Sequence, residues 1–122
     1  MFVSLIQDIK IEIVSYEESK GKYPKRGQIV ALHYEGFLAD GTMFDSSRKR
    51  GRPLTFQIGA KQVIDGLDYA VSKVPVGARA KITIPQEHAY GTNGFPGLIP
   101  PNSTLIFDLA LLSSEEKGIR DV

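Results

Sequence analysis

The chain of 122 residues contains no cysteine and no tryptophan, and it has only two histidines. The lack of cysteine excludes disulfide frameworks, thiolate zinc sites, iron–sulfur clusters and cysteine nucleophiles, so nothing in the composition requires an oxidising compartment. His33 and His88 stand alone, and neither HExxH nor another paired-ligand spacing occurs. We therefore expect the protein to use no metal and no cofactor.

Motifs of covalent and nucleotide chemistry are missing as well. The chain has no G-x-S-x-G nucleophile elbow and neither a G-x-x-x-x-G-K-[ST] nor a G-x-G-x-x-G phosphate loop. It also lacks a long hydrophobic run, because Gln7 and Asp8 interrupt the apolar residues 1–6 well short of the roughly 20 residues of a spanning helix. We expect a cytoplasmic protein without a membrane partner.

Charge of one sign is not in excess. Fifteen basic and 14 acidic side chains leave a net charge of +1, which provides no long-range field for a polyanion. The one basic cluster lies within residues 48–52 and is short, since a useful nucleic-acid footprint needs about 6–10 phosphate contacts. We therefore interpret residues 46–53 as a solvated loop. Nucleic-acid binding, which would depend strongly on salt, is the least favoured alternative.

The length and the hydrophobic pattern predict one domain over residues 1–122, with a core from about residue 9 to about 113 and short extensions. Apolar residues alternate with polar ones at the period of a strand. The predicted strands cover residues 9–13, 28–36, 54–58, 81–84 and 105–111. Ile64, Leu67, Val71 and Val74 recur at spacings of three and four and predict one short helix. The fold class is α+β: an antiparallel sheet of about five strands wrapped around one short helix.

Residues 86–103 form a long connection between the last two predicted strands. It is rich in glycine and proline, but it also carries Tyr90, Phe95, Leu98 and Ile99, which a disordered linker would lack. We expect this connection to be ordered and to cover part of the domain.

The carboxylates offer little support for acid–base catalysis. Asp65 and Asp68 are expected in the first turn of the helix, where negative charge complements the helix dipole. Asp45 follows Phe44 and stands between the expected Asp40-Gly41 turn and the basic loop, so we expect it to be partly buried and to need polar partners.

A set of aromatic and aliphatic residues remains once reactive motifs are excluded. Its members are Tyr34, Phe44, Phe56, Val63, Ile64, Leu67, Tyr90, Phe95, Ile99 and Phe107. Periodicity alone does not separate a solid core from a lined pocket, and both interpretations stay open. The tyrosines favour a pocket slightly, because a buried hydroxyl needs a partner and apolar pockets often carry a few polar points.

Several short stretches, taken in order, resemble the FKBP-type peptidyl-prolyl isomerases, small domains that bind tacrolimus and rapamycin. The stretches are Tyr23-Pro-Lys-Arg-Gly-Gln28, His33-Tyr-Glu-Gly36, Asp40-Gly41, Phe44-Asp-Ser-Ser-Arg48, Val63-Ile64, Ala89-Tyr-Gly91, Gly97-Leu-Ile-Pro-Pro101 and Thr104-Leu-Ile-Phe107. Each stretch alone is weak, but the ordered set is highly specific and spans nearly the whole chain.

The resemblance implies a twisted sheet around the helix, with an apolar pocket between them. It implies catalytic roles for Asp45, Tyr90, Phe107 and Tyr34, with Asp45 held by hydrogen bonds to Tyr34 and Arg50. It further implies that substrate or drug is bound by Phe44, Arg50, Leu54, Phe56, Val63, Ile64, Leu67, Phe95, Leu98 and Ile99. In this scheme the Tyr90 hydroxyl and the Ile64 backbone N–H bind ligand carbonyls.

Three residues depart from the most familiar members of that family. Leu67 stands where a tryptophan usually forms the pocket floor, Leu54 where phenylalanine is common, and Phe95 where histidine is frequent. The smaller leucine keeps the floor apolar and makes the pocket deeper or looser.

The implied function is isomerisation of Xaa-Pro bonds during protein folding, with binding of macrolides such as tacrolimus and rapamycin. The expected partners are proline-containing peptides and proteins, these macrolides and a drug-dependent partner protein, and we expect a monomer. The alternative is a non-catalytic module that uses the same pocket to hold a proline-containing segment or a macrolide.

Overall fold

The computed structural model of the protein describes residues 2–6, 8–19 and 21–118. Within these residues, seven strands form one antiparallel sheet in the order β1-β2-β6-β7-β3-β4, and β5 pairs with β3. The strands are β1 (Phe2–Ile6), β2 (Ile9–Ser15), β3 (Ile29–Leu38), β4 (Met43–Ser46), β5 (Leu54–Gln57), β6 (Arg79–Ile84) and β7 (Leu105–Glu115). The helices are α1 (Ser47–Arg50) and α2 (Asp65–Val71), and η1 (Gln86–His88) is a 3-10 turn.

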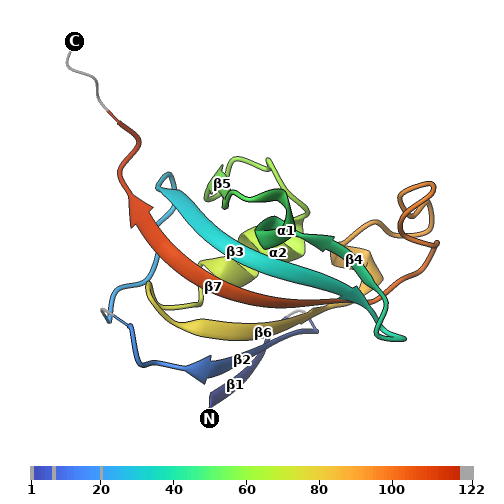
Figure 1. Ribbon diagram of the computed structural model, residues 1–122, viewed down its shortest axis with the longest axis horizontal. Coiled ribbons are helices and arrows are strands. Elements are labelled where there is room, and N and C mark those ends of the chain that lie inside the picture. Colours follow the sequence, from blue (N-terminus) through green and yellow to red (C-terminus); the bar gives the residue numbers. More distant parts are fainter. Residues whose placement is uncertain (1, 7, 20, 119–122) are drawn as a thin grey trace.

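The sheet twists and curves around α2, with β1 at one edge and β4 near the other (Figure 1). Alternate residues of the strands point inward, as the sequence pattern predicts. Ile11 on β2, Leu32 on β3, Ile82 on β6 and Leu109 on β7 are all buried, and Leu67, Ala70 and Val71 of α2 belong to the same core. The α+β fold class is therefore confirmed.

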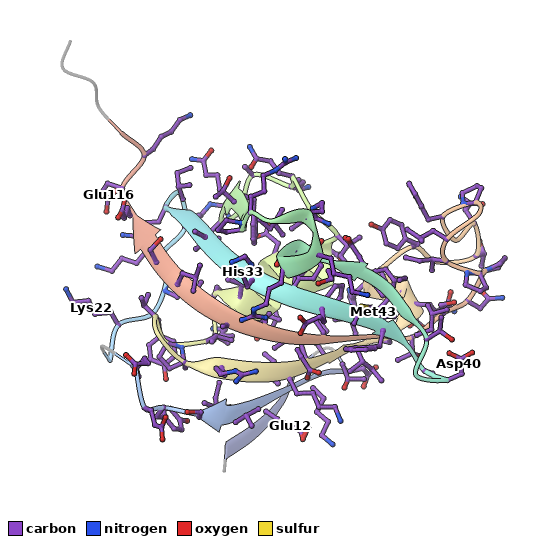
Figure 2. All side chains as sticks on the ribbon, viewed as in Figure 1. Glu12, Lys22, His33, Asp40, Met43 and Glu116 are labelled. Atoms are coloured by element: carbon purple, nitrogen blue, oxygen red, sulfur yellow. The ribbon has the colours of Figure 1, made fainter. Side chains whose placement is uncertain are left out.

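Two strands and a helical turn were not predicted. Strand β1 lies in the apolar segment before residue 9, and β4 follows the Asp40-Gly41 turn, whose tip carries Asp40 in Figure 2. The expectation of a solvated loop over residues 46–53 is wrong for Ser46 and Ser47, which are buried. The Ser46 side chain caps the start of α1 by accepting a hydrogen bond from the Lys49 backbone N–H at 3.2 Å. This capping bond favours a helical turn in a segment whose polar composition indicated a loop.

The predicted helix ends earlier than expected. Val74 lies beyond α2, in a turn closed by a hydrogen bond from its backbone N–H to the Val71 carbonyl. Its side chain is nevertheless completely buried. Because the apolar stripe continues past the helix, periodicity alone placed the end too late. Helix α2 has seven residues, and no helix in the described part of the chain has the length and apolar character needed to cross a bilayer.

The connection from β2 to β3 must cross the ends of β6 and β7, which lie between those strands in the sheet. It is held there by a 2.7 Å hydrogen bond from the Val76 N–H to the Lys22 carbonyl. Next to this bond, Gly77 adopts a φ of +91°, and a Cβ at this position would lie 1.9 Å from the Glu18 carbonyl oxygen. Only glycine satisfies both the backbone angle and the close approach.

We predict that Gly77→Ala destabilises the protein by at least about 2 kcal/mol more than Gly41→Ala. The matched control is informative because Gly41 has nearly the same φ of +92° but nothing within 4 Å of its added Cβ. Free energies of unfolding from denaturant titration measure the difference. Equal losses in the two variants would show that the approach to Glu18 imposes no constraint.

Candidate functional site

A pocket of about 180 Å³ opens between the sheet and the start of α2. It is lined by Tyr34, Phe44, Asp45, Leu54, Gln62, Val63, Ile64, Leu67, Tyr90 and Phe107. These residues come from β3, β4, β5, β7, the start of α2 with the segment before it, and the 86–103 connection. Segments far apart in the sequence therefore build one small, mostly apolar chamber.

Three aromatic rings form the inner wall. The Phe107 ring meets the Tyr34 ring edge-on at a centroid distance of 5.7 Å and the Phe44 ring at 5.8 Å. This arrangement needs Gly36, since a Cβ there would lie 2.6 Å from Cζ of Phe44. The ring of Phe44 thus lies directly over β3, and the wall is rigid because each ring packs against another.

The one carboxylate in the pocket is tied to its neighbours. The Tyr34 hydroxyl donates to Oδ2 of Asp45 at 2.5 Å, and the Ser46 backbone N–H donates to Oδ1 at 2.8 Å. Arg50 donates from Nη1 to Oδ1 of Asp45 and from Nη2 to the Tyr34 hydroxyl at 3.3 Å. The structure thus contains both hydrogen bonds that the resemblance implies for Asp45. With both oxygens engaged, this carboxylate is suited to shaping the wall rather than to taking up a proton.

Helix α1 places Arg50 for this contact. The buried Ser47 hydroxyl accepts a hydrogen bond from the Tyr34 backbone N–H at 2.8 Å, which fastens the start of α1 to β3. Nδ1 of His33 lies 2.8 Å from the same hydroxyl, on a side chain drawn in mid-strand in Figure 2. His33 therefore has a structural partner, and the single turn of α1 presents Arg50 beside Asp45.

The two donors that the resemblance implies for ligand carbonyls have no protein partner among the described residues. The Tyr90 hydroxyl and the Ile64 backbone N–H donate no hydrogen bond within the part of the chain that the structure describes. Tyr90 is 38% exposed, and its ring lies 5.7 Å from that of Phe95. Both donors are thus available to an acceptor such as a ligand carbonyl.

The structure brings together nine of the predicted site residues. Those that line the pocket are Tyr34, Phe44, Asp45, Leu54, Val63, Ile64, Leu67, Tyr90 and Phe107. Gln62 also lines it and was not predicted, because a glutamine between two loop residues carries no distinctive signal. Ser47 was likewise missed; the only available signal was the Ser-Ser pair directly after Asp45.

Five predicted residues do not line the chamber. Phe56 is 3% exposed and belongs to the core, and Arg50 lies behind Asp45. In the 86–103 connection, Phe95 pairs with Ile99 in a short bridge, and Leu98 is 44% exposed. This connection is held by backbone hydrogen bonds such as that from the Phe95 N–H to the Ile99 carbonyl at 2.8 Å, in keeping with the prediction of an ordered segment.

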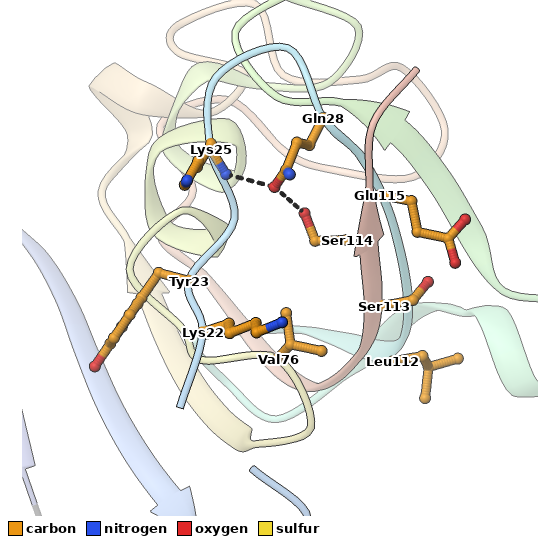
Figure 3. Close-up of a pocket in the computed structure, with 9 residues that line it drawn as sticks. All are labelled: Lys22, Tyr23, Lys25, Gln28, Val76, Leu112, Ser113, Ser114 and Glu115. Atoms are coloured by element: carbon orange, nitrogen blue, oxygen red, sulfur yellow. Dashed lines mark hydrogen bonds between the residues drawn. The ribbon is translucent and has the colours of Figure 1, made fainter. Parts of the chain in front are cut away.

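A larger cavity of about 680 Å³ lies at the other end of β7. Figure 3 shows that its wall is mainly polar or charged, with Lys22, Lys25 and Glu115 among the residues that line it. The side-chain oxygen of Gln28 accepts hydrogen bonds from the Lys25 N–H at 2.9 Å and the Ser114 hydroxyl at 2.8 Å. Val76 and Leu112 also line it, but none of the predicted site residues lies there.

Burial also changes the acidity of the two pocket tyrosines. Desolvation raises the pKa of Tyr34 above its ordinary value, and its hydrogen bond to Asp45 raises it further. Desolvation likewise raises the pKa of Tyr90, with a smaller contribution from the charge of Asp45. Both hydroxyls therefore stay protonated, and able to donate, throughout the neutral range.

Comparison with known proteins places the chain in a well-populated group. A family model described as "FKBP-type peptidyl-prolyl cis-trans isomerase" matches residues 20–112. FK506-binding protein 1 of Debaryomyces hansenii is 52% identical over 105 residues, which cover 85% of this chain and 92% of that protein. Peptidyl-prolyl cis-trans isomerase Fkbp12 of Drosophila melanogaster is 50% identical over 106 residues, covering 86% and 98%.

A solved structure gives the same result for the fold. FkpA from Escherichia coli matches with a TM-score of 0.83 and 39% sequence identity. The match covers 93% of this chain and 52% of the FkpA chain, so this chain corresponds to about half of that protein.

We predict that the tyrosinate absorbance of the folded protein develops at higher pH than that of the denatured chain. The folded state retains protons on Tyr34 and Tyr90 that the unfolded chain loses near pH 10. The contribution of these two protonated hydroxyls to stability is therefore full below about pH 10, and it is lost as the pH rises through the raised pKa values. Ultraviolet titration of the wild type, Tyr34→Phe and Tyr90→Phe tests this. Each variant should lose part of the absorbance that develops at the higher pH. Loss only of absorbance that develops near pH 10 would contradict the assigned effect of burial on the pKa values.

Proposed function

The chain belongs to the FKBP-type peptidyl-prolyl cis-trans isomerases, and we propose that it isomerises Xaa-Pro bonds in the 180 Å³ pocket between the sheet and α2. The observation that carries this assignment is that the edge-on pair Tyr34 and Phe107 lines one pocket with the apolar Leu67, beside the Tyr90 hydroxyl and the Ile64 N–H, which have no protein partner among the described residues. We also propose that residues 1–122 form one domain with its core at about 9–113. The absence of cysteine supports a cytoplasmic location.

The reaction needs no bond to be made or broken. The peptide bond before proline rotates over tens of seconds or more, because a barrier of about 18–20 kcal/mol opposes loss of amide resonance. In the twisted transition state the nitrogen lone pair leaves conjugation and the amide becomes less polar. Water stabilises the planar amide more than the twisted one, so a pocket that excludes water favours the twisted state relative to the planar one.

The lining residues provide such a surrounding. The prolyl ring would contact Tyr34, Leu67 and Phe107, while the Tyr90 hydroxyl and the Ile64 N–H would hold the flanking carbonyls. Asp45, fixed by Tyr34 and Arg50, would keep the wall in place on the side where the carbonyl rotates. Positioning and desolvation then replace proton transfer as the source of rate enhancement.

The floor of the pocket distinguishes this chain. Leu67 is 4% exposed and closes the bottom with a branched aliphatic side chain. An aliphatic floor offers less contact area to the prolyl ring than an aromatic one, so remote contacts carry more of the substrate affinity. We propose an apolar residue before the proline as the preferred substrate feature.

The same pocket is proposed to bind tacrolimus and rapamycin, since relatives at about half identity are named FK506-binding proteins. Phe95 and Leu98, two exposed apolar side chains of the 86–103 connection, would then remain available to a partner protein after the drug has bound.

We predict that Phe107→Ala and Asp45→Ala each lower kcat/KM for Xaa-Pro peptides by about tenfold or more. Loss of the Phe107 ring removes the inner wall, and loss of the Asp45 carboxylate frees Tyr34 and Arg50. A protease-coupled proline-peptide assay measures the rates, and circular dichroism verifies the fold, because Phe107→Ala also costs about 3–5 kcal/mol of stability.

Leu112→Ala is the matched control, since Leu112 is an exposed apolar residue of β7 outside this pocket. Its activity should equal that of the wild type, and tacrolimus should inhibit both proteins by competing with the peptide. Full activity of folded Phe107→Ala and Asp45→Ala would overturn the assignment of the pocket.

A further inference from the structure

Strand β1 forms a free edge of the sheet. Residues Phe2–Ile6 pair antiparallel with β2 on one side, and in the described part of the chain no strand pairs with their other side (Figure 1). An unpaired edge presents alternating N–H and C=O groups that can accept another strand. The only extensive contacts of β1 within the described residues are with β2.

The sequence of β1 lacks the charge and the proline that often protect an edge. The segment FVSLI contains no charge, no proline and no glycine, and β-branched and aromatic residues favour an extended conformation. The opposite edge differs, because β4 contains Asp45 and leads into the basic helix α1, and β5 follows Pro53. Charge and proline thus protect one edge of the sheet, whereas β1 is unprotected.

Every residue of β1 except Ser4 is apolar. In the register, Phe2 and Ile6 stand opposite Ile13 and Ile9, two buried residues of β2. Val3 and Leu5 stand opposite Glu12 and Lys10. A strand exposed to water on its outer face would normally carry polar residues there.

We propose that β1 pairs antiparallel with β1 of a second copy of this chain, about a two-fold axis at Ser4. Phe2 of one copy then faces Ile6 of the other, and Val3 faces Leu5, so every pair beside the axis is apolar and no like charges meet. Within each copy, Val3 stands opposite Glu12 and Leu5 stands opposite Lys10. The residues opposed across the seam are therefore, in order, Glu12 and Val3 of one copy and Leu5 and Lys10 of the other. The charges that flank the seam are therefore of opposite sign.

The pairing leaves both isomerase pockets open. Strands β2, β6 and β7 lie between β1 and β3 in the sheet order, and none of the residues that line the pocket comes from β1 or β2. The dimer would thus present two pockets on one continuous sheet, which suits a substrate with several prolyl bonds. A seam only five residues long is small, so we expect a Kd of about 10 µM to 1 mM.

The test is the oligomeric state of the full chain as a function of concentration. Sedimentation should detect a monomer–dimer equilibrium in the wild type and a monomer in Val3→Lys. In the variant two lysines would lie diagonally across the seam and repel each other. Within its own copy each lysine stands opposite Glu12, so the pairing of β1 with β2 should be kept. Leu112→Lys is the matched control, since it adds the same charge at an exposed apolar residue remote from β1 and should still dimerise. All three proteins should keep the isomerase activity of the wild type.

A cross-link tests the register. The chain has no cysteine, so Ser4→Cys introduces a single thiol, which should lie opposite its copy across the axis. The Cα atoms of directly opposed antiparallel residues are about 4.5–5.5 Å apart. This separation lies within the range of about 4.4–6.8 Å that a disulfide requires. Mild oxidation should cross-link Ser4→Cys much faster than Ser113→Cys, the matched control on β7. Equal cross-linking rates, a monomeric wild type, or a dimer that survives Val3→Lys would each overturn the proposal.

Discussion

The pairing of β3 with β7 determines what the pocket can do. In this register Gly36 stands opposite Phe107, and Tyr34 lies two residues earlier on β3. Since side chains alternate between the two faces of a strand, a slip of one residue would turn Tyr34 or Phe107 to the outside. Gly36 has no side chain and leaves room for the Phe44 ring. The rings of Tyr34, Phe44 and Phe107 therefore meet because of both the β3–β7 register and the glycine at position 36.

A polar network completes what the strands begin. An aromatic wall alone would not keep a carboxylate such as Asp45 in an apolar setting, because a charge out of water needs partners. Tyr34, Arg50 and the Ser46 N–H supply them, and Ser47 fixes the helical turn from which Arg50 reaches over. Because the Tyr34 hydroxyl and Arg50 donate to Asp45, the two donors proposed for a ligand are the Tyr90 hydroxyl and the Ile64 N–H, which donate no hydrogen bond among the described residues.

Alternation of apolar and polar residues predicted the central strands because each has one buried face, as in β2 and β7. Strand β1 was not predicted, since its sequence FVSLI is apolar except at Ser4 and shows no regular alternation. The buried Ser47 was also missed, because its burial depends on a hydrogen bond to Tyr34, which is distant in sequence. Composition alone favoured a solid core, and periodicity could not separate a core from a lined pocket. The resemblance to a family named nine of the ten lining residues, but it also named five residues outside the lining, such as the buried Phe56.

The central claim is that an apolar, hydrogen-bonded wall accelerates prolyl rotation without any proton transfer. The most direct measurement is kcat/KM for one Xaa-Pro peptide as a function of pH and in deuterated water. The two pocket tyrosines keep their protons in the neutral range, so the rate should be flat from about pH 6 to about pH 9 and unchanged in deuterated water. A bell-shaped profile within that range, or a rate that falls about twofold or more in deuterated water, would contradict the account.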